Sequence, residues 1–339
     1  MKKVLALSLV LALICSAAAF AGGKTDGGGS GAHAFIFKST GNPFGERMMA
    51  GFKDGIAEQG FTAITNAPAL PTAEAQIQMV EQLIAQKVAS ICISGNDFDA
   101  LQPVLTKAMN AGIKVYSTDS AVNPASRATF VNQADPERIG ITLAEAAFDL
   151  AGGSGDVAIL SATSQAANQN TWIEYMQKEF AKPKYANIKL VKIAYGDDLR
   201  DLSVSETEGL LLSYPNLKVI VAPTTVGIAA AAKVITDKNL IGKVNITGLG
   251  LPSEMAEYIT NGSCPYMYLW NPIDNGYLAA FVGTALVSGK ITGKAGESFS
   301  AGKLGNFTVT AAADGGTEVL LGAPFKFEPS NINDWKNVY

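Results

Sequence analysis

The stretch AFIFKSTGNPFGERMMAGFKDGIAEQG, residues 34–60, contains the unit that decides the fold. It begins with a short apolar run, AFIF, which is typical of a buried strand. Asn42 and Pro43 then suit the N-cap and the first position of a helix, and helical spacing of apolar residues continues to a terminating Gly60. The stretch therefore predicts one strand followed by one helix.

The same unit recurs along the chain. Apolar runs FTAIT, ASICIS and IKVYSTD alternate with the helical patterns TAEAQIQMVEQLIAQK and FDALQPVLTKAMNAG, and a second series begins at DVAILS after the break ATFVNQADPERIG. This alternation predicts an α/β fold with two similar doubly wound parallel-sheet lobes. The stretch YMYLWNPIDNGYLAAFVGTALVSGK is too short for a third lobe, and we expect it to return the chain to the first one.

A three-stranded hinge is expected to join the two lobes. The expected boundaries are residues 33–132 plus 272–306 for the N-terminal lobe, residues 133–271 plus 307–339 for the C-terminal lobe, and hinge crossings near residues 131–133, 269–272 and 306–312. Closure of the lobes about this hinge would bring their facing edges together around one ligand.

The N-terminus has the features of an export signal. Two lysines precede an apolar run that ends in small residues and the tripeptide AFA, so we expect a signal peptide at residues 1–21. A flexible Gly-rich linker follows at residues 22–32. We therefore expect a periplasmic or extracellular protein. Lipidation at Cys15 is the alternative to simple cleavage after Ala21.

Composition excludes several classes of function. The 339-residue chain has a net charge of -4 and offers no basic face, so we expect no binding to nucleic acid. His33 is the only histidine, which leaves no His-dependent triad or His-rich metal site. Cys92 and Cys264 lack metal-ligand spacing, and no nucleotide-binding loop or nucleophile elbow is present. We expect no catalytic residue, no cofactor and no metal.

Polar residues gather at the ends of the predicted strands. Lys38 and Asp119 follow strands of the first series, while Asn168 and Gln169 follow the strand DVAILS of the second. Ligands of open parallel sheets bind beyond the carboxyl ends of the strands. Lysine donates, a carboxylate accepts from vicinal hydroxyls, and amides do both, so this collection suits a neutral, polyhydroxylated ligand. A surface lysine and a capping aspartate are the structural alternatives.

Three aromatic residues are candidates for the walls of that site. Phe44 follows the turn before the first helix and can cover the apolar face of a sugar. Trp172 can stack on a ligand or pack its own helix. Trp270 lies beside the expected second crossing, and with its neighbour Asn271 it can line the cleft.

Several motifs together resemble one known family. The stretches FIFKSTGNPF, VYSTDS, FVNQADPERIG, NQNTW, VIVAPTTVGIAAAA and YLWNPIDNGYLA are similar in order and spacing to the periplasmic sugar-binding proteins of ABC importers, type I, ribose-binding-like. Within that family the chain most resembles the autoinducer-2-binding and rhamnose-binding group. The resemblance covers roughly residues 34–339. It implies a monomeric, two-lobed protein that closes on a small sugar and delivers it to a membrane permease and its ATPase.

The resemblance also implies roles for individual residues. In the autoinducer-2 binders a lysine after the first strand and an aspartate of the first lobe contact the ligand, and these positions fall on Lys38 and Asp119. An Asp-Gln pair of the second lobe falls on Asn168 and Gln169.

A Pro-Asp-Ala stretch that supplies backbone contacts in the same group falls on Pro223, Thr224 and Thr225. The chain departs from the autoinducer-2 binders at two of these positions. Asn168 replaces a carboxylate, and Thr225 replaces an alanine. Rhamnose, another deoxy-sugar and autoinducer-2 all remain candidates for the ligand.

The expected function is ligand binding for transport, without catalysis. An exported glycosidase or sugar-modifying enzyme is the first alternative, and it would need paired carboxylates in the cleft, such as Asp97 and Asp119. A sensor that docks on a chemoreceptor after closing is the second.

Overall fold

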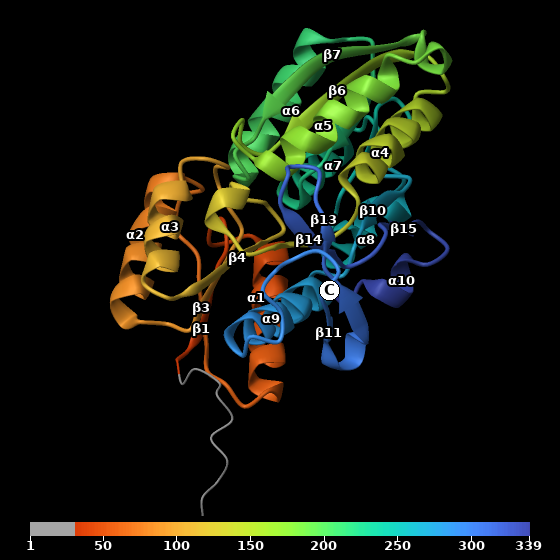
Figure 1. The fold of residues 1–339 in the computed structure, drawn as a ribbon. Helices are drawn as coiled ribbons and strands as arrows, with labels where there is room; N and C mark the ends of the chain where they lie inside the picture. Colours follow the sequence, from red (N-terminus) through yellow and green to blue (C-terminus); the bar gives the residue numbers. More distant parts are fainter. Residues whose placement is uncertain (1–30) are drawn as a thin grey trace, which may run out of the picture.

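The computed structural model describes residues 31–339. It has two α/β lobes, each built on a parallel sheet flanked by helices (Figure 1). The expected signal peptide, Cys15 and most of the expected linker lie outside the described residues. No helix of the described part is both long enough and apolar enough to cross a membrane.

The first sheet has the strand order β13-β14-β5-β4-β3-β1-β2 and is parallel except for β13. Its strands are β1 (His33–Ile36), β2 (Ala63–Asn66), β3 (Ser90–Ile93), β4 (Lys114–Thr118), β5 (Phe130–Asn132), β13 (Thr310–Ala311) and β14 (Thr317–Leu320). Its helices are α1 (Pro43–Glu58), α2 (Ala73–Gln86), α3 (Gln102–Asn110) and α9 (Pro272–Val287).

The second sheet has the order β7-β6-β8-β9 and is entirely parallel. Its strands are β6 (Gly155–Ser161), β7 (Ile188–Tyr195), β8 (Leu217–Ala222) and β9 (Asn245–Gly248). Its helices are α4 (Pro136–Leu150), α5 (Ala167–Phe180), α6 (Arg200–Ser213), α7 (Thr225–Asp237) and α8 (Pro252–Asn261).

Short elements complete the chain. Two antiparallel pairs are β10 (Met267–Leu269) with β15 (Phe325–Phe327) and β11 (Ser298–Ser300) with β12 (Asn306–Thr308). The last helix is α10 (Ile332–Trp335), and 3-10 helices lie at Pro124–Ser126, Pro183–Tyr185 and Gly302–Leu304.

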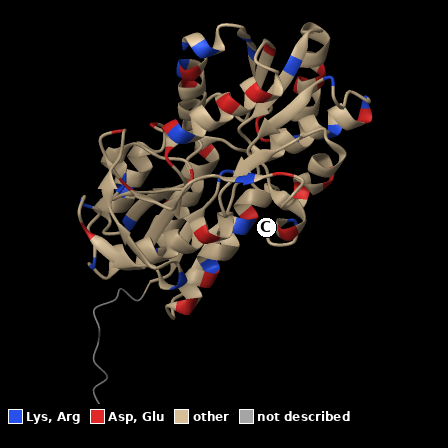
Figure 2. Ribbon diagram, turned by 90° about the vertical axis from the view of Figure 1, so that its right-hand side faces the viewer, with Lys and Arg blue, Asp and Glu red and all other residues tan. Residues whose placement is uncertain are grey.

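The central strands are apolar throughout because helices bury both faces of the sheet. In the first lobe, Phe35 and Cys92 point to the side of the sheet that packs against α1 and α9. Ile36 and Ile91, each one position along, belong to the separate cluster that packs against α2 and α3. The predicted α/β fold with two doubly wound lobes is therefore confirmed. Figure 2 shows acidic and basic residues interspersed over the outer surface of both lobes.

The chain passes between the lobes three times. It leaves the first sheet after β5 and enters α4, which packs against α5 and β8, and it returns from β10 into α9, which packs on α1. The third crossing differs from the expected position near residues 306–312. Residues 307–320 stay with the first lobe, because β12 pairs with β11 and β14 adds to the first sheet beside β5. The chain therefore crosses between β14 and β15.

Helices α1 and α9 pack with their backbones in close contact at two glycines. A Cβ atom on Gly51 would lie 1.9 Å from the carbonyl oxygen of Ile273, and one on Gly276 would lie 1.9 Å from that of Met48. No side chain fits such a gap. The contact holds α9 on the first lobe directly after the second crossing.

We predict that Gly51→Ala destabilises the protein by about 1–3 kcal/mol, because the added methyl group overpacks the contact with α9. Alanine is the better helix former by about 0.5–1 kcal/mol, so a loss of stability would isolate the steric term. The matched control is Gly209→Ala in α6, where a Cβ atom meets nothing within 4 Å. Urea unfolding should show the control unchanged or stabilised. Equal effects of the two substitutions would contradict this account of the packing.

Candidate functional site

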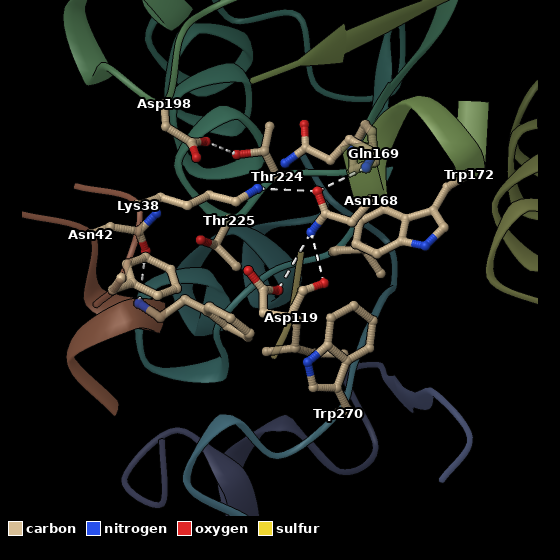
Figure 3. Close-up of a pocket in the computed structure, with 15 residues that line it drawn as sticks. Lys38, Asn42, Asp119, Asn168, Gln169, Trp172, Asp198, Thr224, Thr225 and Trp270 are labelled. Carbon is tan, nitrogen blue, oxygen red and sulfur yellow. Dashed lines mark hydrogen bonds between the residues drawn. The ribbon is translucent and has the colours of Figure 1, made fainter. Parts of the chain in front are cut away.

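A cavity of about 40 Å³ lies between the lobes, where the carboxyl ends of strands from both sheets meet (Figure 3). Both lobes supply its walls. The residues that line it are Phe37, Lys38, Asn42, Phe44, Asp119, Asn168, Gln169, Trp172, Asp198, Pro223, Thr224, Thr225, Leu249, Leu269 and Trp270. The strand-end residues that the sequence singled out thus reach one place, as the geometry of parallel sheets requires.

Lys38 follows β1 and is only 5% exposed, so it is not a surface lysine. Its Nζ donates a hydrogen bond of 3.1 Å to Oδ1 of Asn168 in the other lobe. The Lys38 carbonyl in turn accepts from the side chain of Asn96 at 2.8 Å. This backbone contact fixes the point at which the lysine side chain enters the cavity.

Asp119 follows β4 with a backbone φ of 60°, which aspartate tolerates better than most residues. It is 4% exposed, and Ser94 Oγ donates to its Oδ2 at 2.7 Å. Asn168 Nδ2 lies 3.4 Å from Oδ1. Burial raises the pKa of this carboxyl, while the charge of Lys38 and the Ser94 hydrogen bond act in the opposite direction. The carboxylate is therefore poorly solvated and available as an acceptor.

Asp198 is a site residue that the sequence reasoning missed. It follows β7, in a turn where Asp197 and Asp198 both have positive φ. Its carboxylate accepts a hydrogen bond from Thr224 Oγ1. Burial raises its pKa, and the Thr224 hydrogen bond and the charge of Lys38 lower it. Figure 3 shows Lys38 extending between Asp198 and Asp119.

The two amides after β6 are held in different ways. Asn168 spans the cavity, since its Oδ1 accepts from Lys38 and its Nδ2 lies 3.3 Å from the carbonyl oxygen of Asp119. Gln169 Oε1 accepts from Ser161 Oγ and from the backbone N–H of Ala162, each at 2.7 Å. These two hydrogen bonds fix the orientation of the Gln169 side-chain amide. Its Nε2 is then the group that can donate to a ligand.

Aromatic rings form the apolar wall. Trp270 packs edge-on against Phe44 and Trp172, with ring centroids 6.2 Å and 5.7 Å apart. All three rings are buried. Trp270 Nε1 is also buried and has no hydrogen-bond partner among the described residues. An unpaired buried N–H is costly, so this wall contains one donor that suits a ligand oxygen.

The segment after β8 borders the cavity from the second lobe. Pro223, Thr224 and Thr225 all line it, and Thr224 caps α7. Asn271, in contrast, does not line the cavity. Its Oδ1 accepts from the backbone N–H groups of Ile273 and Asp274 and caps α9, so the structure does not bring this predicted residue to the site.

The donor set of the cavity does not suit a metal. Across residues 31–339 the structure has no group of three or more His, Cys, Asp or Glu side chains placed to hold a metal ion. The arrangement of one ammonium, two carboxylates and three amides beside aromatic rings is suited to hydrogen bonding with a small hydroxylated molecule.

Comparison with known proteins identifies a family to which this chain is similar. The profile of the periplasmic binding protein domain matches residues 33–291. The chain belongs to the periplasmic binding protein family. The resemblance inferred from the sequence motifs is thus confirmed.

Solved structures of periplasmic binding proteins are similar over almost the whole chain. An ABC transporter solute-binding protein from Clostridium phytofermentas, with bound L-rhamnose, is 51% identical, covers 91% of this chain and 99% of its own, and has a TM-score of 0.90. A sugar ABC transporter protein from Actinomyces odontolyticus is 40% identical, with coverage of 90% and 97% and a TM-score of 0.71. LsrB from Clostridium saccharobutylicum, in complex with autoinducer-2, shares the fold at 24% identity, with coverage of 90% and 99% and a TM-score of 0.84.

This periplasmic binding protein therefore has the fold of the solute-binding proteins of sugar ABC transporters. Two of these relatives are described as a solute-binding protein and a sugar transporter protein of ABC systems.

The raised pKa of Asp119 leads to a prediction about stability. We expect Asp119→Asn to increase the free energy of unfolding at neutral pH, because the amide removes a desolvated charge and also tolerates the positive φ. The gain should be complete above the pKa of Asp119 in the folded protein and should shrink as the pH falls through it. Below the ordinary aspartate pKa the gain should vanish.

Urea unfolding at a series of pH values measures this effect. The control is Asp54→Asn, which changes an exposed carboxylate on α1 and should alter stability by less than about 0.5 kcal/mol. A loss of stability in Asp119→Asn at neutral pH would show that the carboxylate is stabilised where it lies.

Proposed function

We propose that the protein is the extracytoplasmic solute-binding component of an ABC importer and that it takes L-rhamnose or a closely related 6-deoxyhexose. The lobes close on the sugar about the hinge, and the complex delivers it to a permease with its ATPase. One observation carries this proposal. The cavity joins a polar side made by Lys38, Asp119 and Asn168 to an aromatic side that includes Trp270.

The polar side matches adjacent ring hydroxyls. The ammonium of Lys38 donates to hydroxyl oxygens, while the carboxylates of Asp119 and Asp198 accept from hydroxyl groups. Hydrogen bonds to charged groups contribute roughly 1.5–3 kcal/mol each, against about 1 for neutral pairs. Burial of these groups strengthens each bond, because little water competes inside the cavity.

The aromatic side matches a deoxy-sugar. Phe44, Trp172 and Trp270 present ring faces and edges to C–H groups, and a methyl substituent gains about 0.8 kcal/mol when it is buried. A hydroxymethyl group in the same place would need an acceptor as well as a donor, and the group of this wall that has no partner among the described residues, Trp270 Nε1, can only donate. The relative with bound L-rhamnose, 51% identical, supports this ligand. The amide at Asn168 is a further reason to favour a sugar over autoinducer-2, whose binders carry a carboxylate there.

Other parts of the proposal follow from the family and from the sequence. The expected signal peptide would place the protein in the periplasm or on the outer face of the membrane, and we expect it to act as a monomer. The cavity does hold two carboxylates, Asp119 and Asp198, which the glycosidase alternative requires. Burial raises the pKa of both and the charge of Lys38 opposes the rise in both, so neither is set apart as a general acid, and we keep the binding role. A chemoreceptor would be a second partner for the same closed complex.

We predict that L-rhamnose binds and stabilises the protein against heat more than autoinducer-2 or D-arabinose does. Isothermal titration calorimetry and thermal unfolding should be run across 6-deoxyhexoses, pentoses and autoinducer-2. The proposal is wrong if no 6-deoxyhexose binds, or if autoinducer-2 binds more tightly than all of them.

A second prediction concerns Lys38. Lys38→Met keeps the aliphatic stem but removes the ammonium, and it should weaken sugar binding by about 10- to 100-fold. The matched control is Lys53→Met, at an exposed position of α1. Circular dichroism should first establish that both variants fold. Unchanged affinity in folded Lys38→Met would remove the lysine from the site.

A further inference from the structure

A second cavity, of about 340 Å³, adjoins the first. The two share Asp119, Asn168 and Trp172 as lining residues. The second cavity also lies between the lobes, and it is bordered by the start of α4, by α5 and by the β13–β14 loop. A volume of this size is typical of a ligand pocket, whereas the first cavity is small because the side chains of Lys38 and Asn168 meet across it.

We propose that this second cavity holds a second sugar ring, glycosidically linked to the sugar in the first. The ligand class then includes disaccharides of the deoxy-sugar. This inference rests on the proposed function for the first ring and adds the recognition of the second.

Gln133 gives the most direct support. Its residue is 1% exposed and lines the second cavity, yet its side-chain Oε1 has no hydrogen-bond partner among the described residues. A buried amide oxygen that accepts no hydrogen bond is costly. A sugar hydroxyl can donate to this oxygen.

Aromatic rings again form part of the wall. Phe98 and Tyr175 are half-buried and line only the second cavity, while Trp172 lines both. Such rings provide apolar area for the C–H face of a pyranose. Each cavity therefore combines aromatic rings with hydrogen-bonding groups, which is the combination that one sugar ring requires.

The charged groups of the second cavity select against anions. Its carboxylates are those of Asp119, Asp135, Glu137, Asp314 and Glu318, and none of the described residues that line it is a lysine or an arginine. Nearby groups hold two of them in place, since Arg127 pairs with Asp314 at 2.6 Å and Asn132 donates to Glu318 at 2.8 Å. Neutral hydroxyl donors fit this lining. Uronic acids and sugar phosphates do not.

Asn168 is the partition between the cavities. Its two contacts to Asp119, at 3.3 Å and 3.4 Å, are long for hydrogen bonds and therefore weak. A ring in the first cavity has to replace the bonds that Asn168 makes across it. Because Asp119, Asn168 and Trp172 line both cavities, a ligand that fills the two can be continuous, which favours one linked molecule.

Calorimetry with L-rhamnose and with L-rhamnosyl-L-rhamnose disaccharides, linked through each ring hydroxyl in turn, tests the proposal. We expect at least one disaccharide to bind with one-to-one stoichiometry and at least as tightly as L-rhamnose. Tyr175→Ala and Gln133→Met should each lower the ratio of disaccharide to monosaccharide affinity by about tenfold. Gln133→Met keeps the volume and removes the unpaired amide oxygen, so it should also fold stably. Phe61→Ala, at a 39% exposed aromatic residue that lines neither cavity, is the control.

The inference is overturned if every disaccharide binds more than about tenfold less tightly than L-rhamnose, or if neither variant changes the ratio. Binding of L-rhamnose alone would leave the proposed function in place and remove only the second-ring site. Binding of a disaccharide alone would support the second-ring site and contradict the monosaccharide as the ligand. Failure of both sugars to bind would contradict both proposals.

Discussion

The site depends on a buried lysine whose charge is balanced from both lobes. Lys38 and Asp119 belong to the first lobe, and Asn168 and Asp198 to the second. A buried ammonium is stable only where acceptors surround it. Because two of these three acceptors, Asn168 and Asp198, lie across the cleft, the pairing of Lys38 ties the chemistry of the cavity to the relative position of the lobes.

The rest of the fold serves to place these groups. Parallel sheets buried on both faces bring strand ends of each lobe to one edge, and glycine contacts at Gly51 and Gly276 seat α9 against α1 next to the second crossing. The positive φ of Asp119 and the raised pKa of its carboxyl both cost free energy. The large apolar core of the two lobes can offset such costs. Groups with perturbed pKa values that gather in one cavity are typical of a binding site.

The strand–helix alternation was sufficient to predict the two lobes, and the rule that ligands bind beyond strand ends led to Lys38, Asp119, Asn168 and Gln169. Asp198 escaped the same rule. It follows β7, an edge strand that is half-buried rather than uniformly apolar, so the sequence does not mark the end of this strand as a buried strand end. The second cavity could not be foreseen, because it forms only where segments far apart in the chain meet.

The two remaining differences also have physical reasons. Asn271 precedes a proline, as Asn42 does, and both side chains cap the helix that follows, so the motif reports a helix start and carries no information about the ligand. The third crossing was misplaced because β12, β13 and β14 are two to four residues long. Strands so short have no readable periodicity, and β14 is defined by its pairing with the distant β5.

A crystal structure of the protein with L-rhamnose would test the central claim most directly. We predict one sugar ring between the lobes, with Lys38 Nζ and the Asp119 carboxylate within hydrogen-bonding distance of its hydroxyls and its methyl group against Phe44 or Trp270. A sugar bound outside this cavity, or one in it that touches neither Lys38 nor Asp119, would contradict the account.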